Sequence, residues 1–230
     1  MTLGYLLLWP GMDATAFLGS RPHPAKPDIG EWALALFNLA AGLVLLFWVI
    51  PEITSERAII EGWIGMIGLV FVLHFGLFHV MSLCWRLNGV DAQPIMNFPI
   101  LSSSLSDFWG RRWNSAFRHL AFTRVFRPLA GRMGVAWTTM VVFVVSGLIH
   151  DLILSVPVHG GWGKPTVYFV LQGIGLLVER SHLGRRLGCG KGVVGRLVCG
   201  LFVVAPLGLL FHEPFVRHAI LPTLAALGIR

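Results

Sequence analysis

The 230-residue chain has few charged residues, and this shortage argues against a soluble fold. Asp, Glu, Lys and Arg make up 13% of the residues, against about 25% in an ordinary soluble domain. Hydrophobic residues make up 55%, and the mean hydropathy is +0.73. Tyrosine is scarce, with 2 residues, but 9 Trp and 16 Phe are present, and Trp favours the membrane–water interface. This composition indicates an integral membrane protein.

Cysteine is also scarce, and familiar catalytic motifs are missing from the sequence. The 3 cysteines, Cys84, Cys189 and Cys199, form no CxxC pair and have no metal-ligand spacing, so we expect free thiols. The sequence contains no HExxH, no Gly-rich phosphate loop and no GxSxG. A metal site and a serine nucleophile are therefore without support. We expect no metal and no bound cofactor.

The positive charge is placed in loops, which argues against nucleic acid as a partner. A net charge of +7 would by itself suit nucleic-acid binding, but the basic residues lie in short stretches between apolar runs. Residues 107–132 and 179–196 are basic, whereas residues 51–61 are acidic. Two expected spans separate the basic stretches, so both fall on one side of the membrane. The positive-inside rule predicts that this side is cytoplasmic.

Apolar runs that approach the roughly 20 residues of a membrane span alternate with polar or Pro-rich stretches. We expect membrane segments at 31–50, 64–87, 133–156, 166–178, 197–211 and 215–227, preceded by a short apolar run at 3–9. A cleaved signal peptide is not expected, because the first run is short and lacks a basic flank. The sequence predicts an all-α, polytopic transmembrane helical bundle of about six to seven membrane segments, in a single domain covering residues 1–230.

Residues 106–127 are basic and Trp-rich, and we expect one amphipathic interfacial helix that ends at Arg127-Pro128. One face of this helix would carry Trp109, Trp113, Phe117 and Leu120, and the opposite face Asp107, Arg111, Asn114 and Arg118. The helix could be a plain anchor whose arginines contact lipid phosphates. Alternatively, its polar face points into a cavity and binds the phosphates of a thioester carrier, because arginine forks suit phosphate.

His150 lies inside the apolar run 133–156. An ionisable group in a span is costly in lipid and indicates a function. Ser146 and Gly147 fall on the same side of the helix and are small, which would let another helix or an acyl chain approach. Burial favours the neutral imidazole that a general base needs, although a structural histidine bonded to a neighbouring helix is the alternative. Asp151 points about 100° away, so we do not expect it to pair with His150.

Two short motifs follow one another in the middle of the chain. SDFWGRRWN ends in Trp113-Asn114, and SGLIHD supplies His150 on a later span. This pair resembles the motifs of membrane-bound O-acyltransferases, particularly the wax synthase branch. The segments LLLWPGMD and LFHEPFVRHAILP also resemble parts of wax-synthase-like proteins. The chain is shorter than many members of that family, and we expect it to lack some of their N-terminal helices.

The resemblance implies acyl transfer from a thioester, either acyl-CoA or an acyl carrier, to the hydroxyl of a lipophilic, long-chain alcohol within membrane lipids. His150 would take the hydroxyl proton, and Asn114 would orient a reacting group or stabilise developing charge. The donor would enter from the cytoplasmic side, and its expected binding residues are Trp109, Arg111, Trp113, Arg118 and Ser146. The alternatives are acylation of a glycan or sterol hydroxyl, or a non-enzymatic transporter or scaffold in which His150 and Asn114 join helices.

Overall fold

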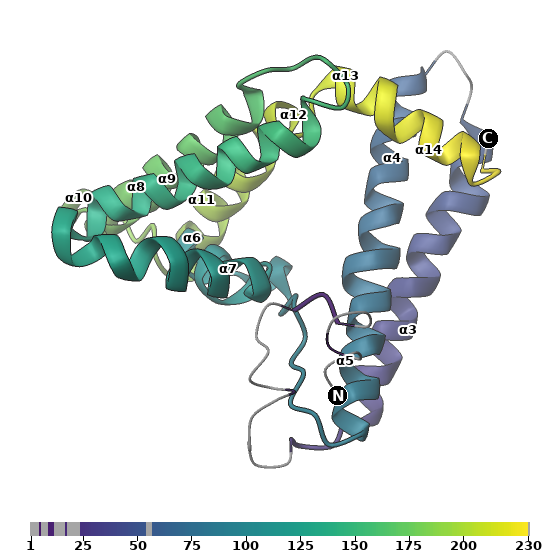
Figure 1. The fold of residues 1–230 in the computed structure, drawn as a ribbon, viewed down its shortest axis with the longest axis horizontal. Coiled ribbons are helices and arrows are strands. Elements are labelled where there is room, and N and C mark those ends of the chain that lie inside the picture. The colour runs from purple at the N-terminus through teal and green to yellow at the C-terminus, as the bar shows by residue number, and fades with distance from the viewer. Residues whose placement is uncertain (1–4, 6–8, 12–16, 18–23, 54–56, 230) are drawn as a thin grey trace. The chain divides into compact units, whose positions relative to one another are not determined.

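The computed structural model describes residues 5, 9–11, 17, 24–53 and 57–229, and its ordered elements are helices (Figure 1). No strand occurs among these residues, which confirms the all-α prediction. The expected apolar run at 3–9 lies largely outside the described residues. The chain divides into two compact units. Unit 1 contains Met1–Asn97, Asn114–His119 and Ile220–Arg230, and unit 2 contains Phe98–Trp113 and Leu120–Ala219.

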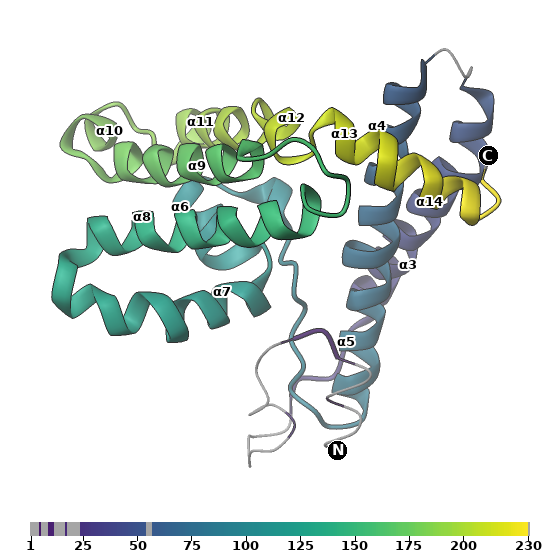
Figure 2. The same cartoon turned by 45° about the horizontal axis from the view of Figure 1, so that its top comes forward.

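Unit 1 is built on two long apolar helical stretches that run side by side (Figures 1 and 2). The first comprises α3 (Ile29–Val44), η1 (Leu45–Val49) and η2 (Ile50–Glu52), and the second comprises α4 (Ala58–Val70), η4 (Phe71–Leu77) and α5 (Phe78–Leu87). The short α14 (Leu221–Ala226) packs on α4. Helix α3 begins at Asp28, whose Oδ1 accepts from the Glu31 amide at 2.8 Å in a reciprocal capping box.

Glycines set the distance between these two stretches. A Cβ added to Gly42 would lie 2.8 Å from the Gly68 carbonyl oxygen, and one added to Gly68 would lie 2.8 Å from Leu46 Cδ2. Gly42 faces backbone and therefore needs a residue without a side chain for the helices to approach this closely, whereas at Gly68 the Leu46 side chain would have to move. Small residues play this role in membrane helix packing, where no hydrophobic effect drives the helices together.

Unit 2 is centred on α8 and α9, which pack antiparallel (Figure 2). Its elements are η5 (Pro99–Leu101), α6 (Leu105–Asp107), η6 (Phe108–Arg112), η7 (Phe122–Phe126), α8 (Arg127–Leu154), α9 (Lys164–Arg180), α10 (His182–Arg186), α11 (Gly192–Val204), α12 (Leu207–Leu210) and α13 (Glu213–Phe215). The division between units falls within α7 (Ser115–Ala121) and η8 (Val216–Ile220). Buried aromatic residues from α6–η6, α8 and α9 form the core of unit 2, among them Phe108, Phe143 and Phe169.

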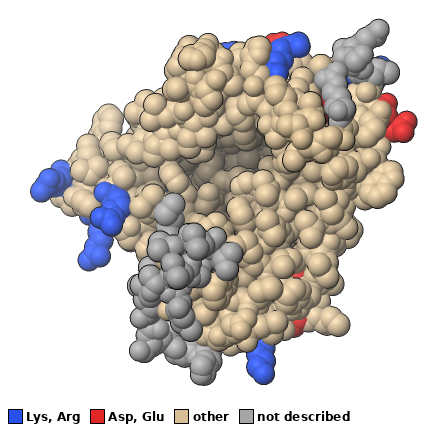
Figure 3. Space-filling model, turned by 45° about the vertical axis from the view of Figure 1, so that its right-hand side comes forward, with Lys and Arg blue, Asp and Glu red and all other residues tan. Residues whose placement is uncertain are grey.

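Four helical stretches are long and apolar enough to cross a membrane: Ile29–Glu52, Ala58–Leu87, Ser115–Leu154 and Gly192–Leu210. They contain or overlap four of the expected segments. The expected segment 166–178 lies within α9, which has 17 residues, and 215–227 is divided among shorter helices. The described residues thus give four such stretches, and the count of six to seven membrane segments stays a prediction. On the face drawn in Figure 3, charged side chains are few and most of the visible surface is uncharged, as lipid contact requires.

The prediction that Pro128 ends a helix is wrong, because the helix continues through η7 into α8. Proline lacks an amide proton and its ring clashes with the carbonyl four residues earlier. Here the preceding π-helical turn, Phe122–Phe126, widens the backbone, and η1 and η8 stand in the same position before Pro51 and Pro222. The backbone instead leaves helical geometry at Gly134, where φ is +77° and ψ is 163°.

Candidate active site

His150 lies near the end of α8, half-buried in unit 2. Its Nδ1 is 2.7 Å from the carbonyl oxygen of Ser146, one turn earlier. A carbonyl can only accept, so Nδ1 carries the proton in this contact, and Nε2 is the basic nitrogen of the neutral ring. The ring centroid lies 4.4 Å from that of Phe169 on α9. This arrangement fixes both the tautomer and the tilt of the imidazole.

Trp109 of η6 and His150 of α8 both contact the ring of Phe169 on α9. The Trp109 ring lies 5.7 Å from Phe169 and 5.7 Å, edge-on, from Phe143. Its Nε1 donates to Gln172 Oε1 at 3.3 Å. The structure therefore brings one expected donor-binding residue and the expected base to the same aromatic cluster in unit 2.

Gly147 lies at the contact between α8 and α9, and its neighbour Ser146 is buried. The Ser146 hydroxyl donates to the Val142 carbonyl at 2.7 Å, and a Cβ on Gly147 would lie 2.7 Å from Thr166 Cα. We expected either another helix or an acyl chain beside these small residues. The structure places helix α9 there. Ser146 touches the site through its backbone carbonyl, which accepts from His150.

The expected continuous helix over 106–127 is wrong, because the backbone breaks in its middle. Trp113 is extended, with φ −96° and ψ 125°, and Asn114 has a left-handed φ of +43°. Trp113 stacks on Phe108 with the ring planes 12° apart. Before the break, α6–η6 is packed into unit 2 rather than lying on a surface, and Leu105 has no exposed area. The helical periodicity correctly predicts helix on either side of the break. The contacts of Phe108 and Trp109 in the core of unit 2 interrupt it at Trp113–Asn114.

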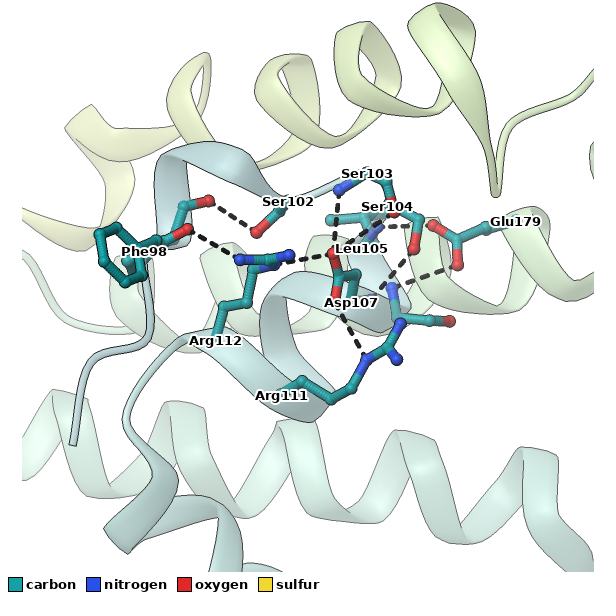
Figure 4. Close-up of polar contacts among 11 residues, drawn as sticks. Phe98, Ser102, Ser103, Ser104, Leu105, Asp107, Arg111, Arg112 and Glu179 are labelled. Carbon is teal, nitrogen blue, oxygen red and sulfur yellow. Dashed lines mark hydrogen bonds and ion pairs between the residues drawn. The ribbon is translucent and has the colours of Figure 1, made fainter. Parts of the chain in front are cut away.

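Asp107 organises the arginines of this segment (Figure 4). Its carboxylate accepts from Arg111 Nε at 3.0 Å and from Arg112 Nε at 2.8 Å, and also from the Ser103 amide at 3.1 Å. Burial by itself would raise the pKa of Asp107, but the bond from Arg112 and the other contacts outweigh it and hold the pKa below its ordinary value. The Arg111 side chain is 75% exposed, against 25% for Arg112, so Arg111 is the more accessible to an anion.

Asn114 belongs to unit 1, whereas His150 belongs to unit 2. Its Oδ1 accepts from the Phe117 amide at 3.0 Å and so caps α7, while its backbone carbonyl accepts from the Arg118 amide at 3.0 Å. The Asn114 amide N–H points to Met96 Sδ at 3.3 Å. Within the described residues, Asn114 Nδ2 makes no hydrogen bond, so the donor end of this side chain can serve a substrate. The Arg118 side chain is exposed on α7.

Sequence reasoning missed two polar residues on α9 that contact the first motif. Gln172 bonds Trp109, and Glu179 accepts from the amides of Leu105 and Ser106. Both are buried, with exposures of 0% and 4%. Their spacing of two helical turns, in an otherwise apolar helix, was a detectable signal of a polar stripe on one face.

A second polar cluster closes the far end of α8. Asp151 accepts from the amides of Gly163 at 2.9 Å and Thr166 at 3.1 Å, and from Ser155 Oγ at 3.0 Å. Ser155 Oγ in turn lies 3.1 Å from Nε2 of His212, a fully buried residue. Burial, reinforced by the nearby Lys164, lowers the pKa of His212 below its ordinary value, against the opposing effect of Asp151. The Asp151 carboxylate caps α9, in agreement with the prediction that it does not pair with His150.

Comparisons with known proteins find similarity over the region that carries both motifs. Residues 92–171, which contain both motifs, match the family model described as "Membrane bound O-acyl transferase family". "Probable long-chain-alcohol O-fatty-acyltransferase 9" of Arabidopsis thaliana is 32% identical over 214 residues, covering 87% of this chain and 62% of that protein. "Long-chain-alcohol O-fatty-acyltransferase" of Simmondsia chinensis is 32% identical over 145 residues, covering 57% and 41%. The chain thus spans about two to three fifths of the length of these curated relatives.

Proposed function

We propose that this chain is a membrane-bound O-acyltransferase that transfers a fatty acyl group from a thioester to the hydroxyl of a long-chain alcohol. The observation that carries the proposal is the His150 imidazole. Its Nδ1 proton is committed to the Ser146 carbonyl, and this makes Nε2 the basic atom. A histidine held in one tautomer inside an apolar helix suits proton abstraction better than simple helix–helix contact.

The reaction needs one base and one hydrogen-bond donor. His150 Nε2 takes the proton of the alcohol as its oxygen attacks the thioester carbonyl carbon. The carbon–sulfur bond then breaks, and the leaving thiolate takes the proton from the imidazolium, which yields an ester and a free thiol. Asn114 Nδ2 donates to the carbonyl oxygen while it carries negative charge. No covalent enzyme intermediate and no bound cofactor are required.

The donor is proposed to be acyl-CoA or an acyl-carrier thioester, both of which carry phosphate. Arg111 and Arg118 are exposed arginines on the first motif and on α7, and their planar guanidinium groups suit phosphate oxygens. Trp109, Trp113 and Ser146 would contact the thioester end of the donor or its acyl chain. We place the basic stretches 107–132 and 179–196 on the cytoplasmic side, where such donors are available.

The long-chain alcohol is the proposed acceptor because the relatives are named for that substrate. A glycan is disfavoured because the helix carrying His150 is apolar and polar groups are costly in lipid. A sterol would pass the same criterion, so an acceptor comparison is part of the test.

The proposal is tested by assaying ester formation in membranes that contain the protein, with palmitoyl-CoA and either hexadecanol or a sterol. His150→Ala and Asn114→Ala should each lower the rate by about 10²-fold or more. The double variant should lose little more than the worse single variant, as expected when two residues serve one step. His182→Ala is the matched control, because His182 is an exposed histidine on α10. Unchanged rates in both single variants would exclude the proposed chemistry.

A further inference from the structure

Helix α9 presents two buried polar side chains to the segment that carries the first motif. Gln172 and Glu179 are seven residues apart, so they fall on the same face about two turns from each other. Their exposures are 0% and 4%. Buried polar groups are costly unless they form hydrogen bonds. Each of these two side chains forms two hydrogen bonds.

Glu179 holds the beginning of α6 (Figure 4). Its Oε2 accepts from the Leu105 amide at 2.6 Å, and its Oε1 accepts from the Ser106 amide at 3.1 Å. The first amides of a helix have no partner within the helix. A carboxylate there accepts from them and interacts favourably with the positive end of the helix dipole. The neighbouring Arg180 donates from Nε to Ser106 Oγ at 3.2 Å. The end of α9 thus makes three hydrogen bonds to the start of the motif, at the Leu105 amide, the Ser106 amide and Ser106 Oγ.

Gln172 holds the same segment one turn later. Its Oε1 accepts from Trp109 Nε1 at 3.3 Å, and its Nε2 donates to the Phe202 carbonyl of α11 at 2.6 Å. Because both ends of the amide are occupied, Gln172 can adopt only one orientation without leaving a buried group unpaired. The Trp109 ring is therefore fixed against Phe169, the residue that also contacts His150.

We propose that Glu179 and Gln172 are positioning residues that hold residues 105–113 on α9 and so set the affinity for the acyl donor. This inference rests on the proposed function. Neither residue touches a reacting atom. Glu179 acts through the α6 backbone, which fixes Arg111 and Arg112 around Asp107, and Gln172 acts through Trp109. His150 is on α8, so loosening this segment changes donor binding more than proton transfer.

The test compares Glu179→Gln with Glu213→Gln in purified protein. A glutamine at position 179 keeps the shape but places an NH2 group against one of the two amides, so one hydrogen bond is lost. Glu213 is an exposed glutamate paired with Arg217 at 2.7 Å, and its variant serves as the matched control. Donor affinity is measured as equilibrium binding of a thioether analogue of palmitoyl-CoA, which does not depend on turnover. We expect Glu179→Gln to weaken binding about five- to ten-fold and to leave the KM for hexadecanol nearly unchanged.

Two further readouts keep the inference separable from folding and from the proposed function. Hydrogen exchange at the Leu105 and Ser106 amides should quicken in Glu179→Gln and stay unchanged in Glu213→Gln. Trp109→Phe and Gln172→Leu should each weaken analogue binding, and the double variant should be no weaker than the worse single variant. This second pair decides the matter if Glu179→Gln does not purify as a monodisperse protein.

The outcomes are distinct. Faster exchange with unchanged analogue binding would overturn the inference, as would additive effects of Trp109→Phe and Gln172→Leu. A wild-type protein that binds the analogue but forms no ester with any alcohol would count against the proposed function alone. A wild-type protein that does not bind the analogue would count against both.

Discussion

The two units pack their helices with glycines in the same way, but they differ in their polar contacts. Gly42 in unit 1 and Gly147 in unit 2 both lie where a Cβ would come within 2.8 Å of backbone atoms on the facing helix. Among the described residues of unit 1, Arg86 pairs with Glu31 and donates to the Ala25 carbonyl, and Ser82 Oγ donates to the Ala92 carbonyl at 2.6 Å.

In unit 2, buried side chains join four segments that are far apart in the sequence. Glu179 and Gln172 hold the first motif, and Asp151 with His212 closes the end of α8. Glycine contacts set how closely two helices approach, but they leave the rotation of side chains open. Fully paired polar groups specify orientation as well. The comparison teaches that the buried polar contacts described in unit 2 hold particular side chains, such as that of Trp109, in one geometry.

The largest effect on stability is expected from Asp151→Ala. This change leaves the Gly163 and Thr166 amides at the start of α9 and the Ser155 hydroxyl without their acceptor. Losing several hydrogen bonds to a charged group should cost about 3 kcal/mol or more, measured by thermal unfolding in detergent. Asp151→Asn keeps one oxygen and should lose less. A cost below about 1 kcal/mol for Asp151→Ala would remove the contrast between the units.

A second prediction tests the glycine contacts that both units share. Gly42→Ala and Gly147→Ala should destabilise the protein by similar amounts, about 1–3 kcal/mol each, because both methyl groups meet backbone that cannot rotate away. Gly200→Ala on α11 is the control, since no atom lies within 4 Å of its added Cβ, and it should be neutral or stabilising. A large cost in only one unit would show that the glycine contacts are not equivalent.

Asp28→Ala should have a smaller effect than Asp151→Ala, although both aspartates cap a helix. Asp28 is exposed and accepts from one amide, that of Glu31, within its capping box. Truncation of such a cap costs about 1 kcal/mol. Equal losses from Asp28→Ala and Asp151→Ala, compared in one unfolding assay, would mean that the additional partners of Asp151 contribute nothing.

The smallest effect concerns pH and His212. The folded state holds the pKa of His212 below its ordinary value of 6.5, so the unfolded chain binds a proton more readily. Its contribution to stability is therefore complete above about pH 6.5 and declines as the pH falls below that value. The unfolding temperature should drop between about pH 7.5 and about pH 5.5, and His212→Gln should flatten this dependence. An identical slope in the variant would assign the pH effect to other groups.

The membrane helices were predictable because their signal is local. Runs such as 31–50 and 64–87 are apolar over most of their length, and length with hydropathy suffices to find them. The Trp-Asn motif and His150 were found from residue order and family resemblance. The roles assigned to these residues remain predictions that mutagenesis must test.

The break at Trp113–Asn114 and the passage of a helix through Pro128 were not predictable from the same rules. The break depends on contacts of Phe108 and Trp109 with distant helices, and the passage depends on a π-turn placed before the proline. Glu179 was counted only as one negative charge beside a basic stretch, because its partners lie some 70 residues earlier. The spacing of Gln172 and Glu179 shows that they share one helix face, but it does not show which distant segment they contact.

The most direct test of the central claim is the rate of ester formation by His150→Asn, at saturating palmitoyl-CoA and hexadecanol, relative to the wild-type rate. The asparagine Nδ2 takes the place of imidazole Nδ1 and can still donate to the Ser146 carbonyl, so the helix should persist, but its amide cannot accept the hydroxyl proton. We predict a loss of about 100-fold or more with an unchanged unfolding temperature. A variant that retains activity within a few-fold of wild type would contradict the role of His150 as the base.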